Sequence, residues 1–89
     1  MSKGEISWVR EAEPEGKLQV YAHRVGNQWN FFARQKRFDE WAAVPHPPLQ
    51  DWLELLDGIR RRVARRLVRP EEIQRVEKVI RERFPEAEI

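Results

Sequence analysis

The sequence predicts an α+β fold, in which a three- to four-stranded antiparallel β-meander precedes two antiparallel C-terminal α-helices packed on one sheet face. Two alternating runs around Gly26-Asn27 indicate a β-hairpin, and apolar residues recur at helical spacing from Leu49 onward. Pro70 interrupts that spacing and Pro85 ends it, so we expect two helices rather than one. The chain has 89 residues, which suits a single domain over residues 1–89.

The hairpin is the clearest local pattern. The runs 17–25 and 28–35 flank Gly26-Asn27, which suits a two-residue turn with Gly at positive φ. In that register Tyr21 lies opposite Phe32, and the alternation of side chains gives the hairpin two faces. We expect the more apolar face to form the core, with the members Leu18, Val20, Ala22, Trp29, Phe31 and Ala33.

A further strand is expected before the hairpin, within residues 5–12, so that residues 5–35 form the meander. The segment Glu13-Pro14-Glu15-Gly16 suits the turn between them. Residues 36–48 are either irregular or contain a short fourth strand, and three prolines hold their end extended. The simplest interpretation of Trp41 and Trp52 is that they anchor this linker to the core.

Two helices are expected next, over residues 49–68 and 70–84. The break at Arg69-Pro70 is short, so the helices should be antiparallel neighbours whose joint apolar surface covers the core face of the hairpin. The apolar stripe of the first helix is predicted to hold Leu49, Trp52, Leu53, Leu56, Ile59, Val63 and Leu67.

Composition favours a cytoplasmic protein without membrane contact. The chain has no cysteine, whereas a secreted domain of this size would usually be stapled by disulfides. No stretch approaches the roughly 20 apolar residues that a membrane helix needs. The N-terminal residues also lack the apolar segment of a signal peptide.

The positive charge is concentrated in one segment. Residues 60–69 contain six Arg and no acidic residue, whereas the rest of the chain has more acidic than basic residues. A face that could bind phosphates or nucleic acid would consist of Arg61, Arg62, Arg65, Arg66 and Arg69. The same order, acidic residues early in the helix and Arg late, is also what the helix dipole favours in a solvated face. An acidic protein partner is a third interpretation.

The second face of the hairpin is a candidate interface. It would present Tyr21, His23, Phe32 and Arg34. Exposed aromatic residues on a sheet are typical of a protein or homodimer interface, although such pairs also stabilise a sheet with no further role. Aromatic rings flanked by basic residues can also stack on nucleic-acid bases. The basic run 34–37 at the strand end is typical of a device against sheet-to-sheet pairing.

Catalysis has little support in the sequence. There is no Cys or Thr, Ser occurs only at positions 2 and 7, and neither His23 nor His46 has metal-ligand spacing. We therefore predict no catalytic residue, no metal and no cofactor. The expected function is a small non-catalytic protein-interaction module or self-associating domain. The alternative is an accessory nucleic-acid-binding protein that uses the arginine face.

Overall fold

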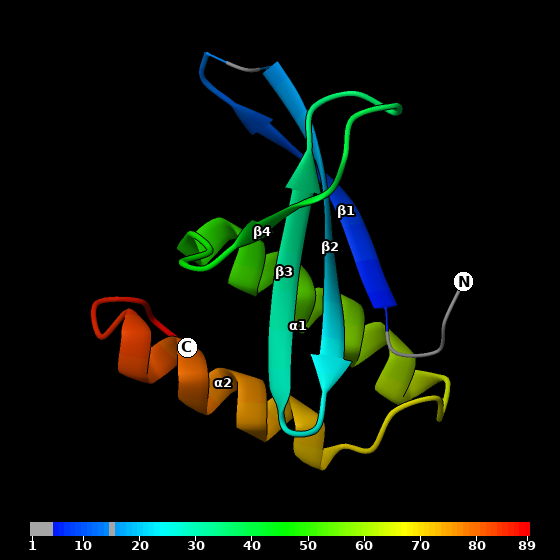
Figure 1. The fold of residues 1–89 in the computed structure, drawn as a ribbon. Helices are drawn as coiled ribbons and strands as arrows, with labels where there is room; N and C mark the ends of the chain where they lie inside the picture. Colours follow the sequence, from blue (N-terminus) through cyan, green and yellow to red (C-terminus); the bar gives the residue numbers. More distant parts are fainter. Residues whose placement is uncertain (1–4, 15) are drawn as a thin grey trace. The chain divides into compact units, whose positions relative to one another are not determined.

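The protein has four antiparallel strands in one sheet followed by two helices, as Figure 1 shows. The computed structural model describes residues 5–14 and 16–89. This element order confirms the predicted α+β class with a β-meander and two C-terminal helices. The chain divides into two compact units, a sheet unit at Met1–Pro47 and a helical unit at Pro48–Ile89.

The sheet unit is a meander with strand order β1-β2-β3-β4. Its strands are β1 (Glu5–Ala12), β2 (Gly16–Val25), β3 (Gln28–Arg34) and β4 (Ala42–Val44). The β2–β3 register pairs Tyr21 with Phe32, as predicted. On the opposite face of the sheet, the predicted core residues Val20, Ala22 and Phe31 are buried.

Turn chemistry sets this register. Gly26 has a φ of 61°, and Asn27 is not among the residues of positive φ in the described part of the chain. Positive φ at the first central position alone is the pattern of a type II′ turn, whose twist matches that of the strands it joins. Between β1 and β2, Gly16 has a φ of 85°, whereas Glu15 of the predicted turn lies outside the described residues.

The segment 36–48 does contain a short fourth strand. Its strand β4 pairs with the end of β3, with Phe31 opposite Val44 and Ala33 opposite Ala42. The loop before it is closed by two hydrogen bonds, from the Asp39 amide to the Lys36 carbonyl and from the Lys36 amide to Asp39 Oδ2, both 2.9 Å long. The second of the two alternatives for this segment is therefore confirmed.

The helical unit consists of α1 (Leu49–Ala64) and α2 (Glu71–Arg83). Two contacts show that the helices are antiparallel, because a residue early in α1 faces one late in α2. The Arg83 guanidinium lies 5.4 Å from the centre of the Trp52 ring, and Arg60 Nη2 donates to Glu77 Oε2 at 3.1 Å. No helix in the described chain is long and apolar enough to cross a membrane.

The buried side of α1 differs from the predicted stripe. Trp52, Leu56 and Ile59 are buried as expected, but Leu53 is 42% exposed and Leu55, which the stripe omits, is fully buried. At about 100° per residue, Leu53 and Leu55 lie on opposite sides of Trp52 and Leu56. The buried side of the helix therefore includes Leu55 and excludes Leu53. The spacing of apolar residues does not determine which of these two flanking leucines is buried.

The first helix also ends earlier than predicted. It ends at Ala64 rather than Val68, because Arg66 takes a left-handed conformation with a φ of 61°. The Leu67 amide donates to the Arg62 carbonyl at 2.8 Å, and the Arg66 amide donates to the Val63 carbonyl at 2.9 Å. These two bonds are the Schellman motif that closes many helices, usually with Gly at the left-handed position.

Replacing Arg66 by Gly should therefore stabilise the protein. Gly removes the cost of placing a Cβ in the left-handed region, so we expect Arg66→Gly to raise the free energy of unfolding by about 0.5–1 kcal/mol in urea denaturation. Arg65→Gly is the control, because Arg65 has a φ of −93° and gains nothing from Gly. Equal loss of stability in both variants would contradict the assigned helix end.

Candidate functional site

The second face of the sheet gathers aromatic residues around one arginine. The rings of Tyr21 and Phe32 are stacked, with centroids 4.9 Å apart and an interplanar angle of 21°. Trp41 meets Tyr21 edge to face, with centroids 4.7 Å apart and planes at 90°. The Arg34 guanidinium carbon lies 4.2 Å from the centre of the Trp41 ring. We name this cluster the aromatic face, and its members are Gln19, Tyr21, Phe32, Arg34 and Trp41.

Strand pairing explains how Trp41 reaches this cluster. Trp41 directly precedes β4, and Ala42 pairs with Ala33, so continuing the register places Trp41 opposite Arg34. The expectation that Trp41 anchors the linker to the core is wrong, since Trp41 is 38% exposed and contacts Tyr21 and Arg34. Trp52, the second predicted anchor, is buried.

Arg34 is held in place by two neighbours. Its Nε donates to Gln19 Oε1 at 2.7 Å, and its planar group lies over Trp41. Within the described chain its two terminal NH₂ groups have no protein acceptor. Arg34 therefore offers two parallel donors with little remaining side-chain freedom, which suits a carboxylate or a pair of carbonyl oxygens.

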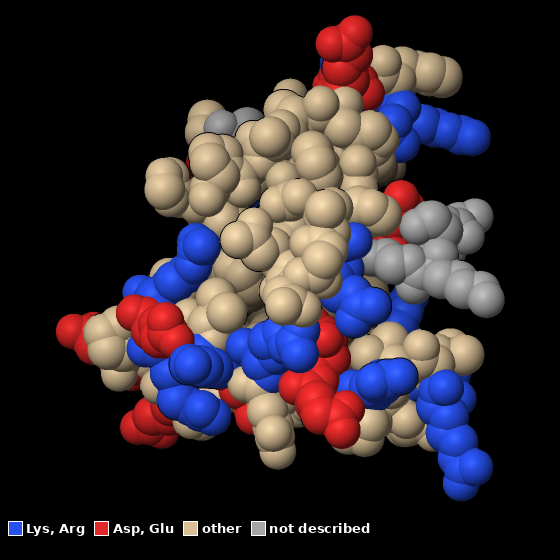
Figure 2. All heavy atoms as spheres, turned by 60° about the horizontal axis from the view of Figure 1, so that its bottom comes forward, with Lys and Arg blue, Asp and Glu red and all other residues tan. Residues whose placement is uncertain are grey.

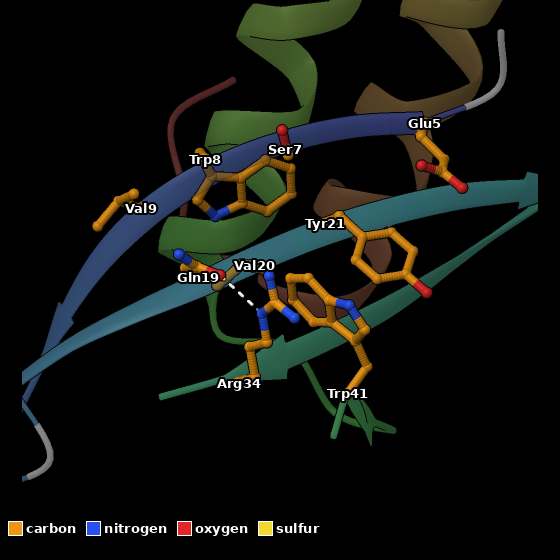
Figure 3. A pocket seen from close by; sticks show the side chains of 9 residues that line it. All are labelled: Glu5, Ser7, Trp8, Val9, Gln19, Val20, Tyr21, Arg34 and Trp41. Carbon is orange, nitrogen blue, oxygen red and sulfur yellow. Dashed lines mark hydrogen bonds between the residues drawn. The ribbon is translucent and has the colours of Figure 1, made fainter. Parts of the chain in front are cut away.

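An open depression of about 470 Å³ lies beside this cluster (Figure 3). Tyr21, Arg34 and Trp41 gather over β2 and β3 on one side of it, while Glu5 and Val9 come from β1. The full lining is Glu5, Ser7, Trp8, Val9, Gln19, Val20, Tyr21, Arg34 and Trp41. Its walls therefore combine aromatic surface with a cation, an anion and a hydroxyl group.

His23 lies at the far end of the same face, two residues along β2 from Tyr21. Its Nδ1 is 4.0 Å from Glu5 Oε1, and the two residues are directly paired between β1 and β2. A histidine beside a carboxylate can act as a base only if it also reaches a nucleophile. Within the described chain no hydroxyl group is hydrogen-bonded to His23, so this pair lacks the nucleophile that such a base would need.

The structure thus brings together all four residues predicted for the sheet interface. Tyr21, Phe32 and Arg34 are in one cluster, with His23 at its edge. Sequence reasoning missed Trp41 and Gln19 as members. The signal for Gln19 was available, because it lies on the same strand face as Tyr21 and opposite Arg34. Trp41 could not be placed on this face from the sequence, because its position depends on the pairing of β4, and the sequence did not decide whether that strand forms.

The five arginines of the predicted arginine face do not lie on one helix in the structure. Arg61 is on the solvent side of α1, where Nη1 lies 3.4 Å from Asp57 Oδ2, and Arg62 is half-buried with a partner of its own. Arg65 closes the helix, and Arg66 and Arg69 lie in the connection to α2. The expectation that one helix carries all five arginines is therefore wrong, because α1 ends at Ala64, before Arg65, Arg66 and Arg69.

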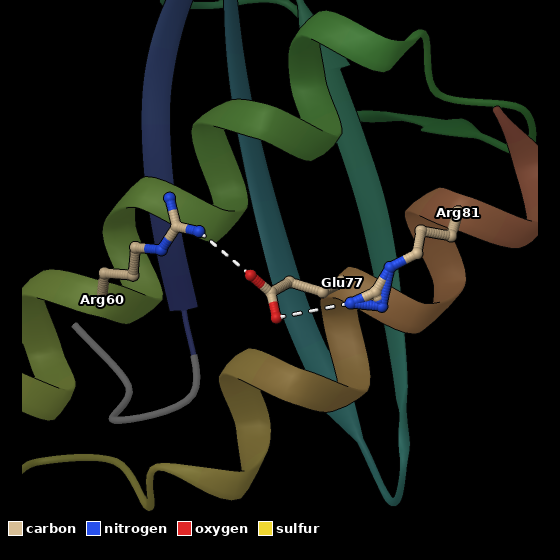
Figure 4. Close-up of polar contacts among 3 residues, drawn as sticks. All are labelled: Arg60, Glu77 and Arg81. Atoms are coloured by element: carbon tan, nitrogen blue, oxygen red, sulfur yellow. Dashed lines mark hydrogen bonds and ion pairs between the residues drawn. The ribbon is translucent and has the colours of Figure 1, made fainter. Parts of the chain in front are cut away.

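Acidic residues also neutralise neighbouring arginines. Figure 4 shows the Glu77 carboxylate between Arg60 and Arg81, at 3.1 Å and 3.7 Å. On the molecular face drawn in Figure 2, Lys and Arg side chains are interspersed with Asp and Glu side chains. This mixed pattern differs from the uniform basic surface that binds nucleic acid through phosphates.

Other site types lack support in the described chain. No group of three or more His, Cys, Asp or Glu residues is arranged there to hold a metal ion. Comparison with known protein families, curated proteins and solved structures found no match to this chain. The aromatic face, built from the residues themselves, is therefore the best-defined candidate site.

The contact between Arg34 and Trp41 predicts a measurable coupling. A half-buried cation–π pair contributes about 1 kcal/mol, so the double-mutant cycle of Arg34→Ala and Trp41→Ala should give a coupling energy of that size in urea denaturation. Arg37→Ala combined with Trp41→Ala is the control, because Arg37 is an exposed loop residue outside the cluster. A coupling no larger than in this control would disprove the contact.

Proposed function

We propose that the protein is a small non-catalytic interaction module that binds a protein partner through the aromatic face. The observation that carries this proposal is the gathering of Tyr21, Arg34 and Trp41 beside an open depression. Trp, Tyr and Arg are the residue types that most often dominate the binding energy of protein interfaces. Their large, stiff side chains bury much surface at little cost in conformational entropy.

Mutual packing preorganises the surface for a partner. Tyr21 is fixed between Phe32 and Trp41, and Arg34 is fixed between Gln19 and Trp41. A partner that docks on this face would order few additional side chains, which lowers the entropic cost of association. The free NH₂ groups of Arg34 favour a partner that presents a carboxylate or backbone carbonyls beside an apolar side chain.

The same packing makes base stacking a weaker candidate. A stacking platform needs aromatic rings with open faces. Here the ring of Tyr21 is stacked on Phe32, and one face of Trp41 is covered by the Arg34 guanidinium. The carboxylate of Glu5 also lies at the rim of the depression, where it would repel phosphates. Nucleic-acid binding therefore remains the alternative to be tested in the same experiment.

Site-specific photo-cross-linking in the cells that make the protein tests this function. Ala43 is exposed and pairs with Phe32, so a benzoylphenylalanine at position 43 would stand on the aromatic face without removing a cluster member. We expect one discrete adduct with another protein, which nuclease treatment leaves unchanged. The adduct should disappear when Trp41→Ala is added, because the partner then loses its main contact.

Ala64 provides the matched control. It is also an exposed alanine, but it ends α1 in the helical unit. The same photoreactive residue at position 64 should give no adduct of that mass. A nuclease-sensitive adduct at position 43 would favour the nucleic-acid alternative, and a mass of two chains would identify a second copy as the partner. Equal yields at positions 43 and 64 would contradict a binding role for the aromatic face.

A further inference from the structure

The outer edge of β1 is a second surface with pairing capacity. In the described sheet β1 has β2 as its neighbour on one side and no strand on the other, and Figure 1 shows it at the margin. All eight residues of β1 pair with β2 in consecutive register, so the strand has no bulge. Regular edge strands expose a row of backbone donors and acceptors that another strand can pair with.

The two edges of the sheet are protected to different degrees. The β4 edge is only three residues long, is followed by Pro45 and follows the loop that carries Lys36 and Arg37. Short length, Pro and Lys are common devices against edge pairing. The β1 edge is eight residues long and its sequence EISWVREA contains no Pro, Gly or Lys, so charge at Glu5, Arg10 and Glu11 is the one protecting device that it carries. It is therefore the less protected of the two edges.

We propose that β1 pairs antiparallel with β1 of a second copy of the chain, about a two-fold axis at Val9, so that the two sheets form one continuous sheet. This homodimer uses the β1 edge rather than the aromatic face, and it goes beyond the proposed function without depending on it.

Symmetry limits the possible registers. When the two-fold axis is perpendicular to the continuous sheet, directly opposite residues of the two β1 strands point to the same face. Because side chains alternate along a strand, such paired residues are an even number of positions apart, and the residue midway between them lies opposite its own copy. Axes at Trp8 or Val9 pair the longest stretches, residues 5–11 or 6–12. The axis at Trp8 places Glu5 directly opposite Glu11 of the other copy, twice. Like charges directly opposite each other destabilise a sheet, which disfavours this register.

The axis at Val9 avoids that repulsion. It places Ser7 opposite Glu11, and Ile6 opposite Ala12, with no like-charged pair within residues 6–12. Val9 is 62% exposed in the single chain and would be covered by its own copy. Trp8 would lie opposite Arg10 on the other face, twice, an arrangement that permits cation–π contacts. Both aromatic faces would then lie on the same side of the sheet, so the dimer would bind a repeated partner bivalently.

Single cysteines test this register directly, because the natural chain has none. In the proposed dimer the Cα atoms at position 9 are about 4.5–5.5 Å apart, a separation that a disulfide can bridge. Position 7 is four residues along the strand from its own copy, about 13 Å away. We expect Val9→Cys to form a covalent dimer under mild oxidation at least about tenfold faster than Ser7→Cys, a control at another exposed position of β1.

Charge exchange at the axis provides the second test, by sedimentation velocity. Val9→Glu and Val9→Lys should each weaken the dimer at least about tenfold, and an equimolar mixture should restore it, since opposite charges then meet at the axis. Val25→Lys, at another exposed valine, should leave the dimer intact. Recovery in the mixture shows that neither variant has unfolded.

Three results would overturn the β1 dimer. The first is a wild-type protein that stays monomeric at about 500 μM, where even a weak interface of this kind would associate. The others are equal rates of covalent dimer formation for Val9→Cys and Ser7→Cys, and no increase in the dimer fraction when the two charged variants are mixed. Each of these leaves photo-cross-linking at Ala43 unaffected, so failure of the dimer and failure of the proposed function can be told apart.

Discussion

The type II′ turn at Gly26-Asn27 fixes the pairing of β2 with β3, and the placement of every side chain on the aromatic face depends on that register. Side chains alternate along a strand, so a slip of one residue would send Tyr21 or Phe32 to the opposite face. The turn holds Tyr21 against Phe32. The pairing of β4 with β3 then brings Trp41 onto the same face, where Arg34 and Gln19 complete the cluster.

In the helical unit, the backbone conformation at one residue determines which of the clustered arginines lie on the same helix. Six arginines in ten residues read as one basic face only if the helix continues through all of them. The left-handed conformation of Arg66 ends the helix, and three of the five candidate arginines, Arg65, Arg66 and Arg69, lie beyond Ala64 in the connection to α2. Arg61 pairs with Asp57 along the helix, and Glu77 joins Arg60 to Arg81 across the two helices. The charges are thus consistent with stabilising roles in the helical unit.

Much of the fold was predictable because its signals are local. Gly26-Asn27 between alternating runs predicts the hairpin and its register, and the helical spacing after Leu49 predicts two helices. The strand β4 was only one of two alternatives, because three residues carry no period of their own and become a strand only by pairing with β3. The helix end was missed because Gly is usual at the position that Arg66 occupies. Tyr21, Phe32 and Arg34 were predictable site residues through their shared strand face, whereas Trp41 depended on the uncertain pairing of β4.

The central claim is that the aromatic face is an assembled but open surface, and proton NMR with a soluble paramagnetic agent tests it most directly. Nuclear Overhauser effects should connect the Tyr21 ring with Phe32 and with Trp41. The agent should broaden the indole signals of Trp41, which is 38% exposed, and leave those of Trp52, which is buried, sharp. Absence of the Tyr21–Trp41 effect, or equal protection of both indoles, would contradict an assembled open face.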